Sequence, residues 1–196
     1  MNCWKQLVFF LWVCILDLCQ SQEQFAGPFR IVVQQIGQCD DTGTHQIYMS
    51  STRINKVSRT KYFYSTNVTT DVIIDDNLTV ELDLANFGNG GYNPHFMTLE
   101  FPTFCTSMKE MIPVFFKAIM DSVHSDCPIQ PGTYEVNNLD MDDLKVAPVV
   151  PNFPYGKYRA DYTGKINGTL VGCIRYYVDV VPAKRMRARN KNKNNN

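Results

Sequence analysis

Apolar and polar residues alternate with a period of two along much of this chain. The clearest example is a pair of runs after Asn77, with apolar residues at Leu78, Val80, Leu82, Leu84, Met97, Leu99 and Phe101. Such alternation is typical of strands that bury one face and expose the other. The turn residues Asn89-Gly90-Gly91 separate the two runs, which predicts a hairpin with a longer loop.

Further segments have strand-like composition between turn signals, at residues 29–36, 46–54, 62–70, 133–140, 156–163 and 169–181. Asn167-Gly168 lies between the last two segments, and this dipeptide is a strong signal for a hairpin turn. About eight strands separated by turns favour an all-β fold over alternating helices and strands. We therefore predict an immunoglobulin-like antiparallel β-sandwich.

One helical segment interrupts the strands, between residues 105 and 123. Its apolar residues recur at spacings of three and four, at Met108, Met111, Ile112, Phe115, Ile119 and Val123. This spacing predicts one inserted amphipathic helix. Pro113 lies within the segment, so we expect either a kink or a helix that begins near Pro113.

The N-terminal region has the composition of a secretory signal. An apolar run from Leu7 to Cys19, broken only by Asp17, is too short to cross ~30 Å of hydrocarbon as a helix. We predict a signal peptide at residues 1–21, cleaved near Ser21, with an uncleaved anchor as the alternative. No later run has the length of a membrane span, so we expect a soluble, extracellular mature chain.

Residues 22–182 are long enough for one domain with a sizeable core. Residues 183–196 are basic and rich in Asn, and we expect a disordered tail. The dipeptide Lys184-Arg185 within this tail also has the composition of a proteolytic processing site. The net charge of the chain is zero, but its charged residues are unevenly distributed, because this tail carries six basic residues and no acidic ones. The acidic body that remains excludes nucleic acid as a partner.

Four cysteines remain after the predicted cleavage, at Cys39, Cys105, Cys127 and Cys173. An even number in a secreted chain predicts two disulfides, and three connectivities are open. The cysteines lack the close pairs of structural zinc sites, so we expect no metal. Sequons at Asn67, Asn77 and Asn167 agree with export and predict a glycoprotein.

Enzyme signatures are absent from the sequence. It contains no G-x-S-x-G, G-x-G-x-x-G, phosphate-loop or H-E-x-x-H motif, and its histidines, His45, His95 and His124, are isolated. The acidic residues Asp75, Asp76, Asp140, Asp142 and Asp143 do not follow calcium-loop spacing. We therefore expect no enzymatic activity, no cofactor and no metal site.

A binding role depends on whether two apolar sheet faces pack solidly or splay apart, and the strand pattern alone leaves both readings open. The loop at residues 146–155 is uncharged and contains three prolines, which exclude a regular interior strand. Its apolar residues form either an exposed flap at a cavity mouth or an inward plug. The candidate ligand-binding residues are Leu78, Val80, Leu82, Leu84, Met97, Leu99, Phe101, Met111, Ile112, Phe115, Ile119, Val149, Val150, Phe153 and Tyr155.

Several short motifs carry a family resemblance. They are Phe104-Cys105, Met111-Ile112-Pro113, Cys127-Pro128, Gly132-Thr133-Tyr134, Gly156-Lys157-Tyr158-Arg159 and Gly172-Cys173-Ile174. With these motifs the chain resembles the ganglioside-activator-like branch of the ML lipid-recognition superfamily, and especially the insect chemosensory CheB-type secreted proteins. The resemblance implies a β-sandwich cup, with Cys39 paired to Cys173 and Cys105 paired to Cys127. It leaves Arg159 either structural or in contact with a polar head group.

The resemblance implies a secreted protein that binds a lipid or hydrophobic small molecule, with a role in perceiving pheromones or cuticular hydrocarbons. It also implies transient membrane contact, and a receptor or channel as a further partner. One alternative is an activator-type protein that presents glycolipid to a hydrolase, although only four of that group's eight cysteines are present. Another alternative is an extracellular interaction module without a ligand.

Overall fold

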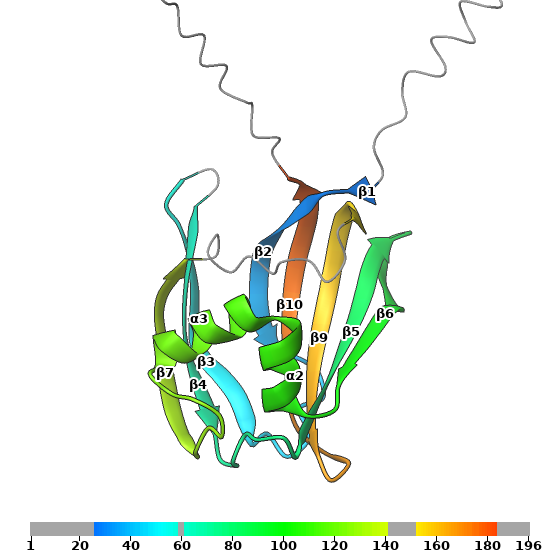
Figure 1. Cartoon of the computed structure of the whole chain (residues 1–196). Coiled ribbons are helices and arrows are strands. Elements are labelled where there is room, and N and C mark those ends of the chain that lie inside the picture. The colour runs from blue at the N-terminus through cyan, green and yellow to red at the C-terminus, as the bar shows by residue number, and fades with distance from the viewer. Residues whose placement is uncertain (1–25, 59–60, 141–151, 184–196) are drawn as a thin grey trace, which may run out of the picture.

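The computed structural model describes residues 26–58, 61–140 and 152–183 (Figure 1). Its elements are β1 (Ala26–Gly27), β2 (Phe29–Gln38), β3 (Ile47–Lys56), β4 (Tyr62–Thr70), β5 (Leu78–Gly88), β6 (Gly91–Phe101), α2 (Phe104–Met111), α3 (Pro113–Val123), β7 (Gly132–Asp140), β8 (Phe153–Pro154), β9 (Gly156–Ile166) and β10 (Thr169–Pro182). Every segment predicted as a strand is a strand. The predicted signal peptide and nearly all of the predicted tail lie outside the described residues.

The strands form an antiparallel β-sandwich, as the sequence predicted. A five-stranded sheet has the order β2-β10-β9-β5-β6, and a three-stranded sheet has the order β3-β4-β7. The short strands β1 and β8 pair separately. All pairs are antiparallel, and β5 shows the physical basis of the fold because its residues alternate between buried and half-buried positions from Leu78 to Leu84.

Two hairpins connect neighbouring strands of the larger sheet. Asn167-Gly168 has positive φ angles of 49° and 77°, which confirms the predicted turn between β9 and β10. Asn89-Gly90 has φ angles of 48° and 87° between the paired Gly88 and Gly91. The prediction of a longer loop there was wrong. The irregularity lies within β6 instead, where residues 94–96 oppose the single Ala85.

The helical insertion consists of two short helices, α2 and α3, rather than one. Ile112 separates them with φ −137° and ψ 54°, and Pro113 occupies the first turn of α3. Proline lacks the N–H that a helix interior requires but is well suited to a first turn. The structure therefore confirms the predicted helix start near Pro113.

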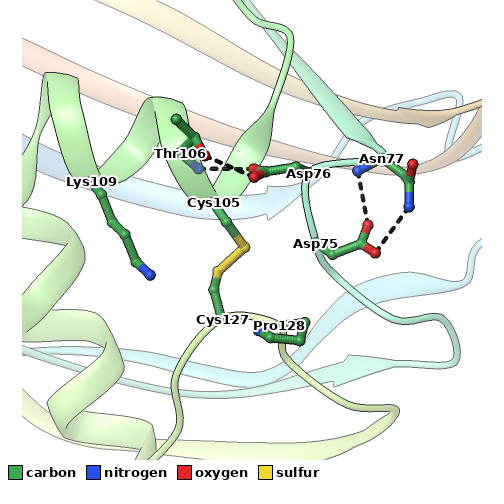
Figure 2. A pocket seen from close by; sticks show the side chains of 8 residues that line it. All are labelled: Asp75, Asp76, Asn77, Cys105, Thr106, Lys109, Cys127 and Pro128. Atoms are coloured by element: carbon green, nitrogen blue, oxygen red, sulfur yellow. Dashed lines mark hydrogen bonds between the residues drawn. A yellow bond between two sulfur atoms is a disulfide. The ribbon is translucent and has the colours of Figure 1, made fainter.

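The start of α2 is capped from another segment of the chain. Thr103 at its N-cap makes no side-chain bond to the helix backbone, and its hydroxyl lies 3.3 Å from the hydroxyl of Ser107. Instead, the Thr106 N–H and hydroxyl donate to the Asp76 carboxylate at 2.8 and 2.7 Å, and these bonds lower the pKa of Asp76 (Figure 2). Asp76 thus satisfies a donor of the first turn and ties α2 to the connection before β5.

The two sheets approach each other where β3 packs against β2 and β10. Gly172 lies at this approach, because a Cβ there would overlap the carbonyl oxygen of Ile47. Away from β3, the helices lie between the two sheets. Helix α3 packs against β7 of the smaller sheet, and α2 packs against β5 and β6 of the larger sheet (Figure 1). The interior is thus bounded by two sheets that meet at one side and by two helices.

Both disulfides have the connectivity that the family resemblance implied. Cys39, just after β2, is bonded to Cys173 of β10, so one bridge joins the first long strand to the last. Cys105 of α2 is bonded to Cys127, which precedes β7 (Figure 2). The second bridge therefore fixes the helices to the start of β7.

Buried apolar residues form two clusters between the sheets. The larger contains Ile74, Leu78, Val80, Leu82, Leu84, Phe101, Phe116, Met120, Ile129, Phe153, Tyr158, Ala160, Val171, Val178 and Val180. The smaller contains Ile36, Tyr64 and Val136, on β2 and the three-stranded sheet. Val33, Val123 and Tyr176 pack against both. The smaller cluster is therefore a satellite of the main core, joined to it by these three residues.

Candidate functional site: the interior between the sheets

The register of the five-stranded sheet places apolar side chains from four strands on one face. Leu82 pairs with Leu99 on one side and with Tyr162 on the other, and Tyr162 pairs with Ile174. The inner face, as we define it, comprises Leu78, Val80, Leu82, Leu84, Met97, Leu99, Phe101, Tyr158, Ala160, Tyr162, Ile174, Tyr176, Val178 and Val180. None of these side chains is charged. All seven candidate residues on β5 and β6 belong to it.

Of the candidate residues on the helices, Ile119 packs against the larger apolar cluster. Met111 is 37 % exposed, and Ile112, Phe115 and Ile119 are half-buried. The fully buried residues of α3 are Phe116 and Met120, which the candidate set did not include. The reason is the break at Ile112, because a helix that restarts at Pro113 no longer continues the helical phase that precedes it. Counting the period from Pro113 would have identified Phe116 and Met120.

The proline-rich loop is described only at its end. Val149 and Val150 lie outside the described residues. Phe153 is only 8 % exposed and packs in an aromatic group, with ring centroids 5.5 Å from Phe29, 6.1 Å from Phe96 and 5.3 Å from Tyr158. For Phe153 the structure therefore favours the inward alternative over an exposed flap.

The Gly-x-Tyr motifs that carried the resemblance have a structural role. The Tyr134 hydroxyl donates to the carbonyl of Gln130 at 2.7 Å, and the Tyr158 hydroxyl donates to the carbonyl of Pro154 at 3.0 Å. Each bond reaches back four residues and closes the bend that leads into a strand. Such a tyrosine holds the bend that leads into the strand, while its ring packs in the core.

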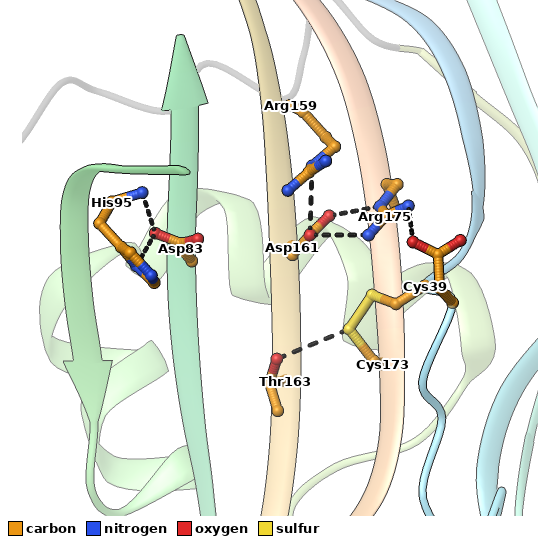
Figure 3. Close-up of polar contacts among 9 residues, drawn as sticks. Cys39, Asp83, His95, Arg159, Asp161, Thr163, Cys173 and Arg175 are labelled. Atoms are coloured by element: carbon orange, nitrogen blue, oxygen red, sulfur yellow. Dashed lines mark hydrogen bonds and ion pairs between the residues drawn. A yellow bond between two sulfur atoms is a disulfide. The ribbon is translucent and has the colours of Figure 1, made fainter. Parts of the chain in front are cut away.

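Arg159 lies on the opposite, outer face of the sheet (Figure 3). Its Nε is 3.2 Å from the Asp161 carboxylate, which also accepts two bonds from Arg175 at 2.7 and 3.0 Å. Arg175 also bonds Asp40 at 3.0 Å, and these carboxylates raise the pKa of its guanidinium. This network supports a structural role for Arg159 rather than contact with a ligand between the sheets.

Two surface cavities lie away from the candidate residues. One, of about 370 Å³, borders the Cys105–Cys127 bridge, Asp75, Asp76 and Lys109 (Figure 2). The other, of about 560 Å³, is lined by residues 120–121 and 124–126. Neither is lined by a residue of the candidate set.

The described part of the chain contains no group of three or more residues arranged to hold a metal ion. Of the histidines, His45 stacks on Tyr48 at 4.7 Å, and His95 contacts Asp83 at 3.1 Å on the outer face (Figure 3). No helix in these residues is long and apolar enough to cross a membrane.

One inner-face residue stands apart from its neighbours. Tyr162 lies in the centre of β9 and is 37 % exposed, whereas Ala160 and Gly164 on the same side of the strand are buried. Its cross-strand neighbour Leu82 is also buried. Removal of water by the surrounding protein nevertheless raises the pKa of Tyr162. Tyr162 is therefore accessible at a position whose neighbours along β9, Ala160 and Gly164, are covered.

Comparison with protein families gives a match over part of the chain. Residues 78–160, from the start of β5 into β9, match a family described as "Protein of unknown function (DUF1091)". The matched region contains both helices, the Cys105–Cys127 bridge and both Gly-x-Tyr motifs. No curated protein matches the chain.

Proposed function

We propose that this protein is a secreted carrier that binds a lipid or another long apolar molecule between its two sheets. The observation that carries the proposal is the accessibility of Tyr162 on an uncharged inner face whose other residues are buried or half-buried. A hydrocarbon chain placed against this face exchanges water for apolar contacts. Burial of ten methylenes contributes roughly 8 kcal/mol before ordering costs, at about 0.8 kcal/mol each. This magnitude is compatible with micromolar binding without a charged contact.

The arrangement of the sheets supports the same function. The sheets meet near β3, and helices rather than a third layer of strands lie between β7 and β5. The two apolar clusters share only a few bridging side chains, which is compatible with sheets that splay apart. Partly buried residues such as Met97, Leu99 and Ile119 border the larger cluster and provide adaptable apolar surface.

Export of the protein is part of this proposal. Two disulfides are typical of oxidising compartments. Of the three sequons, Asn77 and Asn167 are exposed and Asn67 is half-buried on β4. A secreted carrier of this form agrees with the resemblance to the ML superfamily and to CheB-type proteins, from which we propose a chemosensory role in the perception of pheromones or cuticular hydrocarbons.

A tryptophan reporter on β6 tests the proposal. The two native tryptophans, Trp4 and Trp12, lie in the predicted signal peptide. Leu99→Trp places the indole on the inner face, and Glu100→Trp places it on the outer face one residue away. The secreted variants are stripped of lipid and titrated with a brominated fatty alcohol, which quenches indole fluorescence only near contact.

We expect saturable quenching of the Leu99→Trp variant and none of the Glu100→Trp variant, because only the first indole lies beside the proposed ligand. Equal quenching of both variants would indicate adsorption to the surface and contradict an interior site. An absence of quenching in both variants, with no lipid in organic extracts of the wild type, would favour the ligand-free interaction module. Mass spectrometry of organic extracts from natively secreted protein provides an independent check.

A further inference from the structure

Tyr162 and Tyr176 lie on neighbouring strands of the inner face, and neither hydroxyl has a hydrogen-bond partner among the described residues. Other tyrosines that pack against the core differ in this respect. Tyr134 and Tyr158 donate to backbone carbonyls, and Tyr155 donates to the carbonyl of Pro28 at 3.3 Å. Tyr162 is exposed and Tyr176 is half-buried, so their hydroxyls are left to bond water or a ligand oxygen.

The two rings form a compact polar group within apolar surroundings. Their centroids are 5.4 Å apart with an interplanar angle of 75°, an edge-to-face contact. Tyr176 also packs against both apolar clusters, close to Tyr64 of the facing sheet. The Tyr64 hydroxyl is already used, because it donates to the sulfur of Met49 at 3.3 Å.

The hydroxyls keep their protons at physiological pH. Burial raises the pKa of both Tyr162 and Tyr176 above the ordinary value of a phenol. Each group can therefore donate one hydrogen bond and also accept one. A ligand oxygen that reaches this pair replaces water as the partner without requiring any change of charge.

The inner face also limits the charge that the head group of a ligand can carry. Its side chains include no Lys, Arg or His, and the arginines Arg159 and Arg175 lie on the outer face with carboxylate partners (Figure 3). An ionised carboxylate against the inner face would lose its hydration without gaining a cation. A neutral oxygen needs only the hydrogen bond.

We propose that Tyr162 and Tyr176 form a polar anchor that selects long-chain lipids with a neutral oxygen group, such as an alcohol, ester or ketone. The anchor rests on the proposed function, because it acts on a chain already held between the sheets. It distinguishes the preferred ligands from plain hydrocarbons and from ionised fatty acids of the same length.

Displacement of the fluorescent probe N-phenyl-1-naphthylamine from the secreted protein tests the anchor. Dodecan-1-ol, dodecane and dodecanoate serve as competitors for the wild type and for Tyr162→Phe, Tyr176→Phe and the double variant. Tyr177→Phe is the matched control, because Tyr177 is adjacent on β10 but faces the other way, toward Tyr92 at 5.5 Å. Thermal unfolding confirms that each variant is folded.

We expect each inner-face variant to bind dodecan-1-ol about 2- to 10-fold more weakly, the range for one net hydrogen bond, with dodecane unchanged. The Tyr177→Phe control should match the wild type for every competitor. Unchanged affinity for dodecan-1-ol in the double variant would overturn the anchor, and so would a wild-type preference for dodecanoate. Failure of the proposed carrier function would give a different result from failure of the anchor. In that case none of the three competitors would displace the probe from the wild type.

Discussion

The two disulfides differ greatly in the length of chain that each encloses, which makes a quantitative prediction. Cys39 and Cys173 are separated by 134 residues, whereas Cys105 and Cys127 are separated by 22. In the chain-entropy model, a loop of the first size stabilises the native state by about 5 kcal/mol and one of the second by about 3.4 kcal/mol. The short loop is nested within the long one, but the logarithmic dependence makes this correction small.

Replacement of each pair by alanine therefore gives variants that differ in loop length but little in lost packing. Each pair contains one buried cysteine, Cys173 or Cys105, and one half-buried cysteine, Cys39 or Cys127. The free energy of unfolding, measured by urea titration, should fall by about 1.6 kcal/mol more for the long bridge.

An equal or larger loss for the variant that lacks Cys105–Cys127 would refute this reasoning. It would show that the short bridge acts mainly by holding α2 against the start of β7, a contribution of native-state packing that loop length does not describe. The m-value of each titration separates this outcome from a change in the denatured state.

Two further substitutions test local features of the fold. Gly172→Ala should destabilise the protein by about 1–3 kcal/mol, because its Cβ overlaps the Ile47 carbonyl oxygen. Gly37→Ala on β2, where a Cβ meets nothing within 4 Å, is the control, and equal urea midpoints for the two would contradict the steric argument. Asp76→Asn should lower stability most above about pH 4, the unfolded pKa, since Thr106 lowers the folded pKa. This difference from the wild type should shrink as the pH falls through the folded value, and a constant difference would exclude the carboxylate as its source.

The strands were predictable because each buries one face, so alternation in the sequence reports directly on the sheet. The same alternation identified the inner-face residues of β5 and β6 from Leu78 to Phe101. The helix residues were predicted less well, since a period of 3.6 has meaning only within one uninterrupted helix. Pro113 begins a new helix, and Phe116 and Met120 follow its phase.

Features that depend on distant pairs were not predictable from local patterns. The ion pair of Asp40 with Arg175 joins residues far apart in the sequence. The accessibility of Tyr162 depends on which distant segments cover it, and no run of residues within β9 encodes this. Phe153 was assigned to a loop by its prolines, yet pairing with Gly27 carries it inward.

The irregular edge of the larger sheet affects how the protein meets other copies of itself. Strand β6 lies at that edge, and there residues 94–96 bulge around a proline that has no N–H to donate. A second chain would therefore meet an interrupted row of backbone donors and acceptors along this strand. The interruption disfavours the edge-to-edge pairing of β-strands that leads to fibrils.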